Sequence, residues 1–324
     1  MKVLFVVPGE GEGHSMIFAR RQAGSLARQG VRVETFYLGS RTSLGRIFRE
    51  FLRFRETVRA FRPQVIHAQY GTVTALFAAL GCGTIPLAIT YRGSDLNRAP
   101  SERGVRPGIA RLLSQFAALG AARIVCVSRE LRNRLWWRRS RATVLPSGVD
   151  LETFRPDSYR RLRAELGWEE GDRVVLFHAG KNVRNKRLDL AEGAVAEARR
   201  LGIPVSMQVL DGGVPPEKMP ALMNAADCLL LTSDSEGSPT VVQEALATNL
   251  PVVSVDAGDV AERLEGVSHS RLVERDARAL GRALSEVLDP PRRSDGRGRT
   301  EECSSDRMAL RLLELYREMV PEEP

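Results

Sequence analysis

Residues 228–247 read CLLLTSDSEGSPTVVQEALA and give the clearest indication of the fold. Cys228–Thr232 is short and apolar almost throughout, which predicts a strand buried on both faces of a parallel sheet. A helix is expected over Pro239–Ala247, with Ser238 as its N-cap and Pro239 as its first residue. A buried strand, a polar loop and a helix together form one unit of an α/β fold.

The same alternation of apolar runs and helical stretches continues in both directions. The expected strands are 2–7, 31–37, 64–68, 87–90, 123–127, 143–145, 174–178, 205–210, 228–232, 252–255 and 272–273. Helices are expected over 15–29, 108–119, 188–201, 239–247 and 277–288. A break at residues 146–157 separates the two sets, which predicts two βαβ sheets. Ligands of such sheets bind at the carboxyl ends of the strands, so a cleft between the two sets is expected.

The C-terminal part of the chain has a different pattern. Residues 289–305 are rich in Pro, Gly, Arg and Ser, which predicts an exposed connection. Apolar residues at helical spacing then predict a terminal amphipathic helix. They are Met308, Leu312, Leu315, Tyr316 and Met319.

Composition excludes several classes of protein. The 324 residues are 43% hydrophobic and 27% charged, unlike disordered, collagen-like or coiled-coil chains. Four widely spaced cysteines without a CxxC pair argue against a zinc site or a disulfide framework and indicate a reducing compartment. We expect no signal peptide. The apolar run 68–91 is interrupted by three glycines and a proline, so it predicts a helix and a strand rather than a membrane span.

Charge is divided unequally between the two halves. Residues 1–150 carry 24 basic and 9 acidic residues, whereas residues 151–324 carry 24 and 31. The first half therefore suits an anionic partner: phospholipid, a phosphorylated acceptor or nucleic acid. No nucleic-acid-binding module is recognisable, so nucleic acid is not expected.

Two basic segments containing apolar residues predict contact with an anionic membrane. In residues 41–62, one helical stripe is apolar and arginines surround it. The stripe consists of Leu44, Ile47, Phe48, Phe51, Val58 and Phe61. The second segment, residues 129–141, contains Trp136 and Trp137. The alternative is that the stripe packs on the sheet and the arginines face water.

Two loops are candidates for binding an anion. The first, residues 8–14, contains Gly11, Gly13 and His14 between a strand and a helix; an ordinary tight turn is the alternative. The second, residues 179–187, contains Gly180, Lys181 and Lys186, and its lysines can neutralise a diphosphate. It lacks the Walker pattern, and a solvated basic loop is the alternative.

The third candidate is the loop and helix quoted first. Glu236 lies in the loop, where a carboxylate can accept sugar hydroxyls, and Glu244 lies in the helix, where it can accept those of a ribose. The first N–H groups of the helix, at Thr240 and Val241, together with Ser238, suit a phosphate. The alternative is an ordinary loop carboxylate and an exposed helical glutamate.

These residues carry a resemblance to a known family. Glu236 and Glu244 stand in the E-x7-E arrangement of retaining GT-B glycosyltransferases of family 4, and residues 144–156 and 225–262 resemble other signatures of that family. The resemblance implies a GT-B fold with two Rossmann-like, doubly wound domains. It places an acceptor domain at 1–150, a nucleotide-sugar domain at 151–305, and a final helix, 306–324, that returns to the first domain.

The resemblance also implies roles for individual residues. Lys181 and Lys186 match the basic pair that holds the donor diphosphate, although most relatives have Arg at the first position. Glu236 matches the carboxylate beside the donor sugar, and Glu244 the one near the ribose. Residues 90–95 resemble a T-x-H-G-x-D stretch in which Arg92 replaces His and Asp95 is retained. Either a ligand-binding arginine or a plain surface arginine fits there.

The implied reaction is front-face transfer of a sugar with retention, from a nucleotide-diphosphate sugar to a lipid-linked or saccharide acceptor of a cell-surface glycan. No metal or other cofactor is expected, and the expected location is the cytoplasm, with peripheral contact at the inner face of the membrane. The alternatives are a nucleotide-sugar epimerase or hydrolase of the same fold, and a non-catalytic two-lobed binding protein. The short segment 205–227 leaves the base unassigned.

Overall fold

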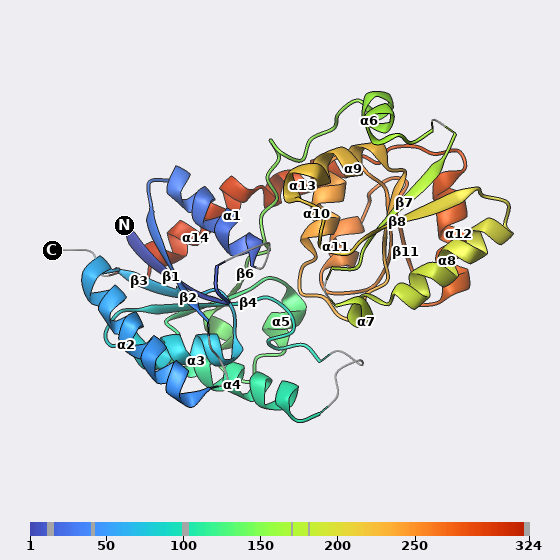
Figure 1. Ribbon diagram of the computed structural model, residues 1–324. Helices are drawn as coiled ribbons and strands as arrows, with labels where there is room; N and C mark the ends of the chain where they lie inside the picture. The colour runs from blue at the N-terminus through green and yellow to red at the C-terminus, as the bar shows by residue number, and fades with distance from the viewer. Residues whose placement is uncertain (12–15, 40–42, 99–103, 170, 181, 321–324) are drawn as a thin grey trace. The chain divides into compact units, whose positions relative to one another are not determined.

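The computed structural model describes residues 1–11, 16–39, 43–98, 104–169, 171–180 and 182–320, and it contains two compact α/β units (Figure 1). The first unit is formed by the described residues up to Gly148 together with the chain from Ser305 onward. The second is formed by Val149–Ser304.

The first unit is a six-stranded parallel sheet with the strand order β2-β1-β3-β4-β5-β6. Its strands are β1 (Lys2–Pro8), β2 (Arg32–Leu38), β3 (Val65–Ala68), β4 (Leu87–Tyr91), β5 (Arg123–Cys126) and β6 (Ala142–Val144). Its longer helices are α1 (Ile17–Arg28), α2 (Leu44–Phe61), α3 (Thr72–Gly81), α4 (Arg106–Gly120) and α14 (Ser305–Arg317), with α5 (Arg129–Asn133) shorter.

Helices cover both faces of this sheet because its strands are apolar on both sides. Alternate residues of β1 point in opposite directions. Leu4 and Val6 pack in the core under α2 and α3, whereas Val3, Phe5 and Val7 pack in the core under α1 and α14. The C-terminal helix α14 therefore belongs to the first unit, where it lies against α1.

The second unit is a five-stranded parallel sheet with the strand order β11-β10-β9-β7-β8. Its strands are β7 (Arg173–His178), β8 (Val205–Leu210), β9 (Cys228–Leu231), β10 (Val252–Val255) and β11 (Arg271–Val273). Its helices are α6 (Tyr159–Leu166), α7 (Val183–Lys186), α8 (Leu188–Arg200), α9 (Met219–Ala225), α10 (Thr240–Ala247), α11 (Val260–Leu264), α12 (Ala277–Leu288) and α13 (Arg297–Thr300). One core lies under α9, α10 and α11, and the other under α8 and α12.

The predicted strands are confirmed, and β8 and β10 match to the residue. The prediction of an exposed connection over 289–305 holds for residues 289–292, which are exposed, but it was wrong for several later residues. Ser294, Thr300 and Cys303 are buried, and the Arg297 guanidinium donates to the carbonyl oxygens of Phe154 and Ala247, both at 2.9 Å. The polar, proline-rich composition of this segment gave no indication that Arg297 would donate to these carbonyl groups.

The prediction of one exposed apolar stripe along α2 was also wrong for most of its residues. Ile47, Phe51, Val58 and Phe61 pack against the core of the first unit, so the packing alternative holds for them. Phe48 remains 62% exposed. Among the described residues, no helix is both long enough and apolar enough to cross a membrane.

Candidate functional site

An ion pair joins two loops at the carboxyl end of the second sheet. The Nζ atom of Lys186, after β7, lies 2.5 Å from Oε1 of Glu236, after β9. Both side chains are largely buried, with 16% and 14% of their surface exposed. The sequence selected both residues, and the structure brings them together. A partly buried charge pair interacts more strongly than one in water.

Hydrogen bonds to backbone carbonyl groups fasten these two segments to each other. The Thr232 hydroxyl donates to the carbonyls of Lys186 (2.7 Å) and Arg187 (3.0 Å). Asn185 donates through its side chain to the Ser235 carbonyl (2.9 Å) and accepts, through its carbonyl, from the Asp234 N–H (2.8 Å). The ion pair therefore sits on a fixed backbone.

The turn after β7 places Gly180 at a φ of +54°, which glycine adopts without strain. Its N–H donates to the Leu210 carbonyl at 3.1 Å, so the turn is attached to the end of β8. Lys181, the predicted first member of the basic pair, lies outside the described residues.

His178, the last residue of β7, is a site residue that sequence reasoning missed. Burial and the nearby Lys186 ammonium lower its pKa, while Glu236 opposes that effect. Its Nδ1 atom is buried, and within the described part of the chain it has no hydrogen-bond partner. The available signal was its position directly before the Ala179–Gly180 turn.

The helix α10 begins beside this pair, but not with the predicted cap. Pro239 is the N-cap, with no side-chain cap bond, so the predictions that Ser238 caps the helix and that Pro239 is its first residue were wrong. The Ser238 hydroxyl instead lies 2.8 Å from Asp259 Oδ2 and accepts from Gln243 Nε2 at 3.0 Å.

Three loops of the second unit meet at the start of α10. A Cβ atom added to Gly258, whose φ is +69°, would lie 2.6 Å from the Gly237 carbonyl oxygen. Arg275 donates to the carbonyls of Thr232 (3.2 Å), Ser233 and Asp256 (3.1 Å). The loops after β9 and β10 are thus held in contact.

Three of the predicted site residues lie in α10 itself. Thr240 and Val241 are the first two residues of α10, where an N–H group has no carbonyl four residues earlier in the same helix. Glu244 lies one turn further along, inside the helix as predicted, and is only 7% exposed. The alternative of a fully exposed Glu244 is therefore wrong.

In the first unit, Asp95 is buried, and its carboxylate stabilises the loop after β4. Its carboxylate accepts from the backbone N–H groups of Gly93 (2.8 Å), Arg92 (3.0 Å) and Gly71 (3.0 Å). Burial raises its pKa, and these N–H groups oppose the rise. The loop is thereby tied to the start of α3.

The Arg92 side chain forms hydrogen bonds within the first unit and does not lie on the surface. It donates to the Gln69 carbonyl (3.0 Å), the Gln69 side chain (2.5 Å) and the Ser147 hydroxyl (3.1 Å). Its guanidinium lies 3.8 Å from the centroid of the Phe18 ring. The alternative of a plain surface arginine is wrong.

A buried histidine lies beside Arg92. His67 shares hydrogen bonds with Tyr316 (2.5 Å) and Thr90 (2.7 Å), and burial together with the Arg92 charge lowers its pKa to about 3. Sequence reasoning missed this histidine, because its partner Tyr316 is 249 residues away.

The loop after β1 is described only in part. Gly11 has a φ of +83°, which side chains rarely adopt, and a Cβ there would lie 2.9 Å from the Tyr37 ring. Gly13 and His14 lie outside the described residues.

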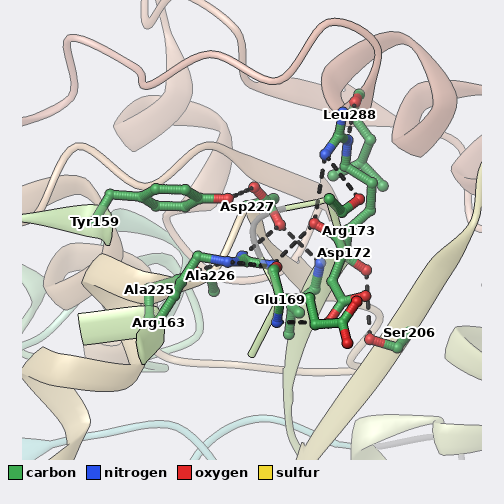
Figure 2. Close-up of polar contacts among 12 residues, drawn as sticks. Tyr159, Arg163, Glu169, Asp172, Arg173, Ser206, Ala225, Ala226, Asp227 and Leu288 are labelled. Atoms are coloured by element: carbon green, nitrogen blue, oxygen red, sulfur yellow. Dashed lines mark hydrogen bonds and ion pairs between the residues drawn. The ribbon is translucent and has the colours of Figure 1, made fainter. Parts of the chain in front are cut away.

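A buried ion pair with a structural role lies at the amino-terminal end of the strands of the second sheet (Figure 2). Arg163 lies 3.3 Å from Asp227, and both side chains are 2% exposed. Asp227 also accepts from the Val174 N–H (2.7 Å) and the Tyr159 hydroxyl (2.9 Å). Burial and Asp227 raise the pKa of Tyr159 to about 12. This network joins the starts of β7 and β9 and leaves their carboxyl ends to the candidate site.

Comparison with known families gives a match in each unit. Residues 11–153 match the model of Glycosyltransferase Family 4, and residues 161–290 match that of Glycosyl transferases group 1. The chain is 28% identical over 247 residues to a Bacillus subtilis protein named as a teichuronic acid biosynthesis glycosyltransferase, TuaC. That match takes in 70% of this chain and 62% of TuaC. The chain spans 62%, 49% and 34% of the first three curated relatives.

Solved structures show the same fold at lower identity. Sucrose-phosphate synthase from Thermosynechococcus elongatus superposes with a TM-score of 0.79 at 18% identity, covering 98% of this chain and 99% of the other. Anabaena HepE, solved in complex with UDP, gives a TM-score of 0.74 at 17% identity, covering 98% and 100%. Both have the two-domain α/β architecture described above.

Proposed function

This chain belongs to glycosyltransferase family 4 and has the GT-B fold, and from that premise we propose that it transfers a sugar from a nucleotide-diphosphate donor. The observation that carries the proposal is the Lys186–Glu236 pair, held at the carboxyl ends of β7 and β9 beside the start of α10. Ligands of parallel α/β sheets bind at that edge.

The charges at this edge suit a diphosphate with a sugar attached. The ammonium of Lys186 and the first N–H groups of α10 offer positive charge, to which Lys181 adds a second ammonium in the proposal. Glu236 positions the sugar hydroxyls, and Glu244 accepts the ribose hydroxyls. Breaking the bond to the diphosphate develops negative charge, which fixed positive groups stabilise.

The proposed reaction retains configuration at the anomeric carbon. The bond between that carbon and the diphosphate oxygen breaks while the acceptor hydroxyl oxygen bonds to the same face. The acceptor proton passes to the departing phosphate oxygen, so no protein base and no metal enters the proposal. Glu236 acts by positioning.

The proposed acceptor is a lipid-linked or saccharide intermediate of a cell-surface glycan. The name of TuaC refers to teichuronic acid biosynthesis, which supports that class. We place the reaction at the cytoplasmic side of the membrane, where the basic first half contacts anionic lipid. In this proposal Arg92 and Asp95 shape the acceptor side by ordering the loop after β4.

Sugar transfer by Lys186→Ala, measured against Lys218→Ala, tests the proposal. Lys218 is an exposed lysine of the same unit, outside the site. We expect Lys186→Ala to lose transfer by about 100-fold or more, and Lys218→Ala to keep the parental rate. Parental transfer by Lys186→Ala would refute the site. Conversion of the donor without any acceptor, followed by NMR, would indicate an epimerase or hydrolase instead.

A further inference from the structure

The helix α4 exposes its large apolar side chains and buries its small and polar ones. An exposed stripe, spaced by four and three residues, runs along the helix from its N-cap. It consists of Val105, Ile109, Leu112, Phe116 and Leu119, which are between 42% and 77% exposed. The buried face consists of Ser114, Gln115, Ala117 and Ala118. A contiguous apolar surface of this kind marks an interaction site.

Two tryptophans widen this surface, and buried Gln115 fixes their position. Its side-chain oxygen accepts from the Trp136 N–H (3.1 Å), and its carbonyl accepts from Trp137 Nε1 (2.7 Å). The Trp137 ring lies 5.8 Å from Phe116 and 5.7 Å from Trp136, centroid to centroid. Trp136 itself is 60% exposed.

A basic pocket opens beside the stripe. It has a volume of about 500 Å³, and Leu112 and Trp136 contribute to its wall. Its four arginines are Arg98, Arg111, Arg134 and Arg139. Carbonyl groups orient two of them: Arg111 donates to Asn97 (3.3 Å), and Arg139 donates to Leu135 (2.6 Å). The pocket thus combines fixed positive charge with an apolar wall.

The surrounding chain has almost no acidic residue to balance this charge. Residues 104–141 contain nine arginines and a single carboxylate, that of Glu130. Glu130 pairs with Arg134 at 2.6 Å, and no carboxylate is among the described residues that line the pocket. A second copy of this chain would bring arginines against arginines, whereas an anionic lipid surface complements them.

We infer that the α4 stripe, Trp136 and the four-arginine pocket form the face that docks on an anionic phospholipid bilayer. A headgroup phosphate enters the pocket, because one guanidinium group can donate two parallel hydrogen bonds to phosphate oxygens. The apolar stripe and the indole then reach the boundary between headgroups and acyl chains. The inference rests on the membrane contact proposed above. It keeps Trp136 of the predicted segment 129–141 and replaces the predicted α2 stripe with the α4 stripe.

Flotation with lipid vesicles tests the inference without donor or acceptor, so its outcome is independent of sugar transfer. The vesicles are phosphatidylcholine alone, or phosphatidylcholine with about 30% phosphatidylglycerol, a content chosen because anionic headgroups attract such surfaces. One variant, Ile109→Ser/Phe116→Ser, removes apolar contact; the other, Arg98→Gln/Arg139→Gln, removes charge. The controls are Leu310→Ser, on an exposed position of α14, and Arg161→Gln/Arg200→Gln, on exposed arginines of the second unit.

We expect the parent and both controls to bind the anionic vesicles and to dissociate in high salt. We expect the affinity of both test variants for these vesicles to be lower by about tenfold or more. Equal binding by parent and test variants would overturn the inference, and so would no binding by the parent. Binding of free glycerol phosphate without vesicle binding would assign the pocket to a soluble anion. A dimer that Ile109→Ser/Phe116→Ser abolishes, without vesicle binding, would assign the face to self-association.

Discussion

Lys186 Nζ and Glu236 Oε1 lie 2.5 Å apart although 50 residues separate them, because parallel β7 and β9 end at the same edge of the second sheet. The pair is nearly buried and its loops are fastened together. Both side chains are therefore held at that end of the sheet, and Glu236 can be tested by a change that preserves shape.

Glu236→Gln keeps the size of the side chain and removes its charge. We expect sugar transfer to fall by about 100-fold, measured at a temperature at which thermal unfolding shows the variant to be folded. Glu217→Gln, at an exposed position in the same unit, is the matched control. Parental activity in Glu236→Gln would show that its carboxylate has no part in transfer.

Gly258→Ala tests the contact between the loops after β9 and β10. The added Cβ would lie 2.6 Å from the Gly237 carbonyl oxygen and would occupy a positive φ. We expect a loss of about 2–3 kcal/mol in the free energy of unfolding, measured by urea titration. Gly266→Ala has a φ of +72° but nothing within 4 Å, so only the conformational cost, about 1 kcal/mol, is expected there. Equal losses would mean that the contact relaxes freely.

The buried pair Arg163–Asp227 is expected to matter far more for stability than an exposed pair on the same helix. Arg163→Leu leaves Asp227 charged and buried, which costs about 3–5 kcal/mol. Arg161→Leu removes exposed ion pairs with Asp157 and Glu165 and is expected to cost about 0–1 kcal/mol. Equal unfolding midpoints in urea for the two variants would contradict this.

His67 is expected to make the protein less stable in acid. Its pKa is about 3 when folded and 6.5 as a free side chain, so the unfolded chain binds the extra proton first as pH falls. Its contribution is complete above pH 6.5 and declines as pH falls toward 3, by about 2 kcal/mol between pH 7 and pH 5. Urea titrations at these two pH values should show a smaller difference in His67→Gln. His178, shifted in the same direction, leaves a residual slope. An unchanged difference would exclude the titration of His67.

The parts of the fold and site that sequence predicted depend on local patterns. Strand, loop and helix follow one another within residues 228–247, so Glu236 and Glu244 could be placed in the loop and the helix. The Ser238 cap could not be judged locally, because its hydroxyl bonds Asp259, 21 residues away.

The other predictions that were wrong also failed because the contacts that decide them lie far apart in the sequence. Periodicity reveals a helical stripe but not which face the rest of the chain covers: the α2 stripe packs inward, and the α4 stripe is exposed. The carbonyl network of Arg297 and the partners of Arg92 come from distant segments. No spacing in the sequence records such contacts.

The proposed reaction requires a donor diphosphate to bind Lys186 beside the start of α10. Isothermal titration with UDP, GDP, ADP and TDP tests it most directly, with the parent, Lys186→Ala and Lys218→Ala compared. We expect at least one diphosphate to bind the parent and Lys218→Ala with equal affinity. We expect its affinity for Lys186→Ala to be lower by about tenfold or more. Equal affinity for Lys186→Ala, or no binding of any diphosphate to the parent, would contradict it.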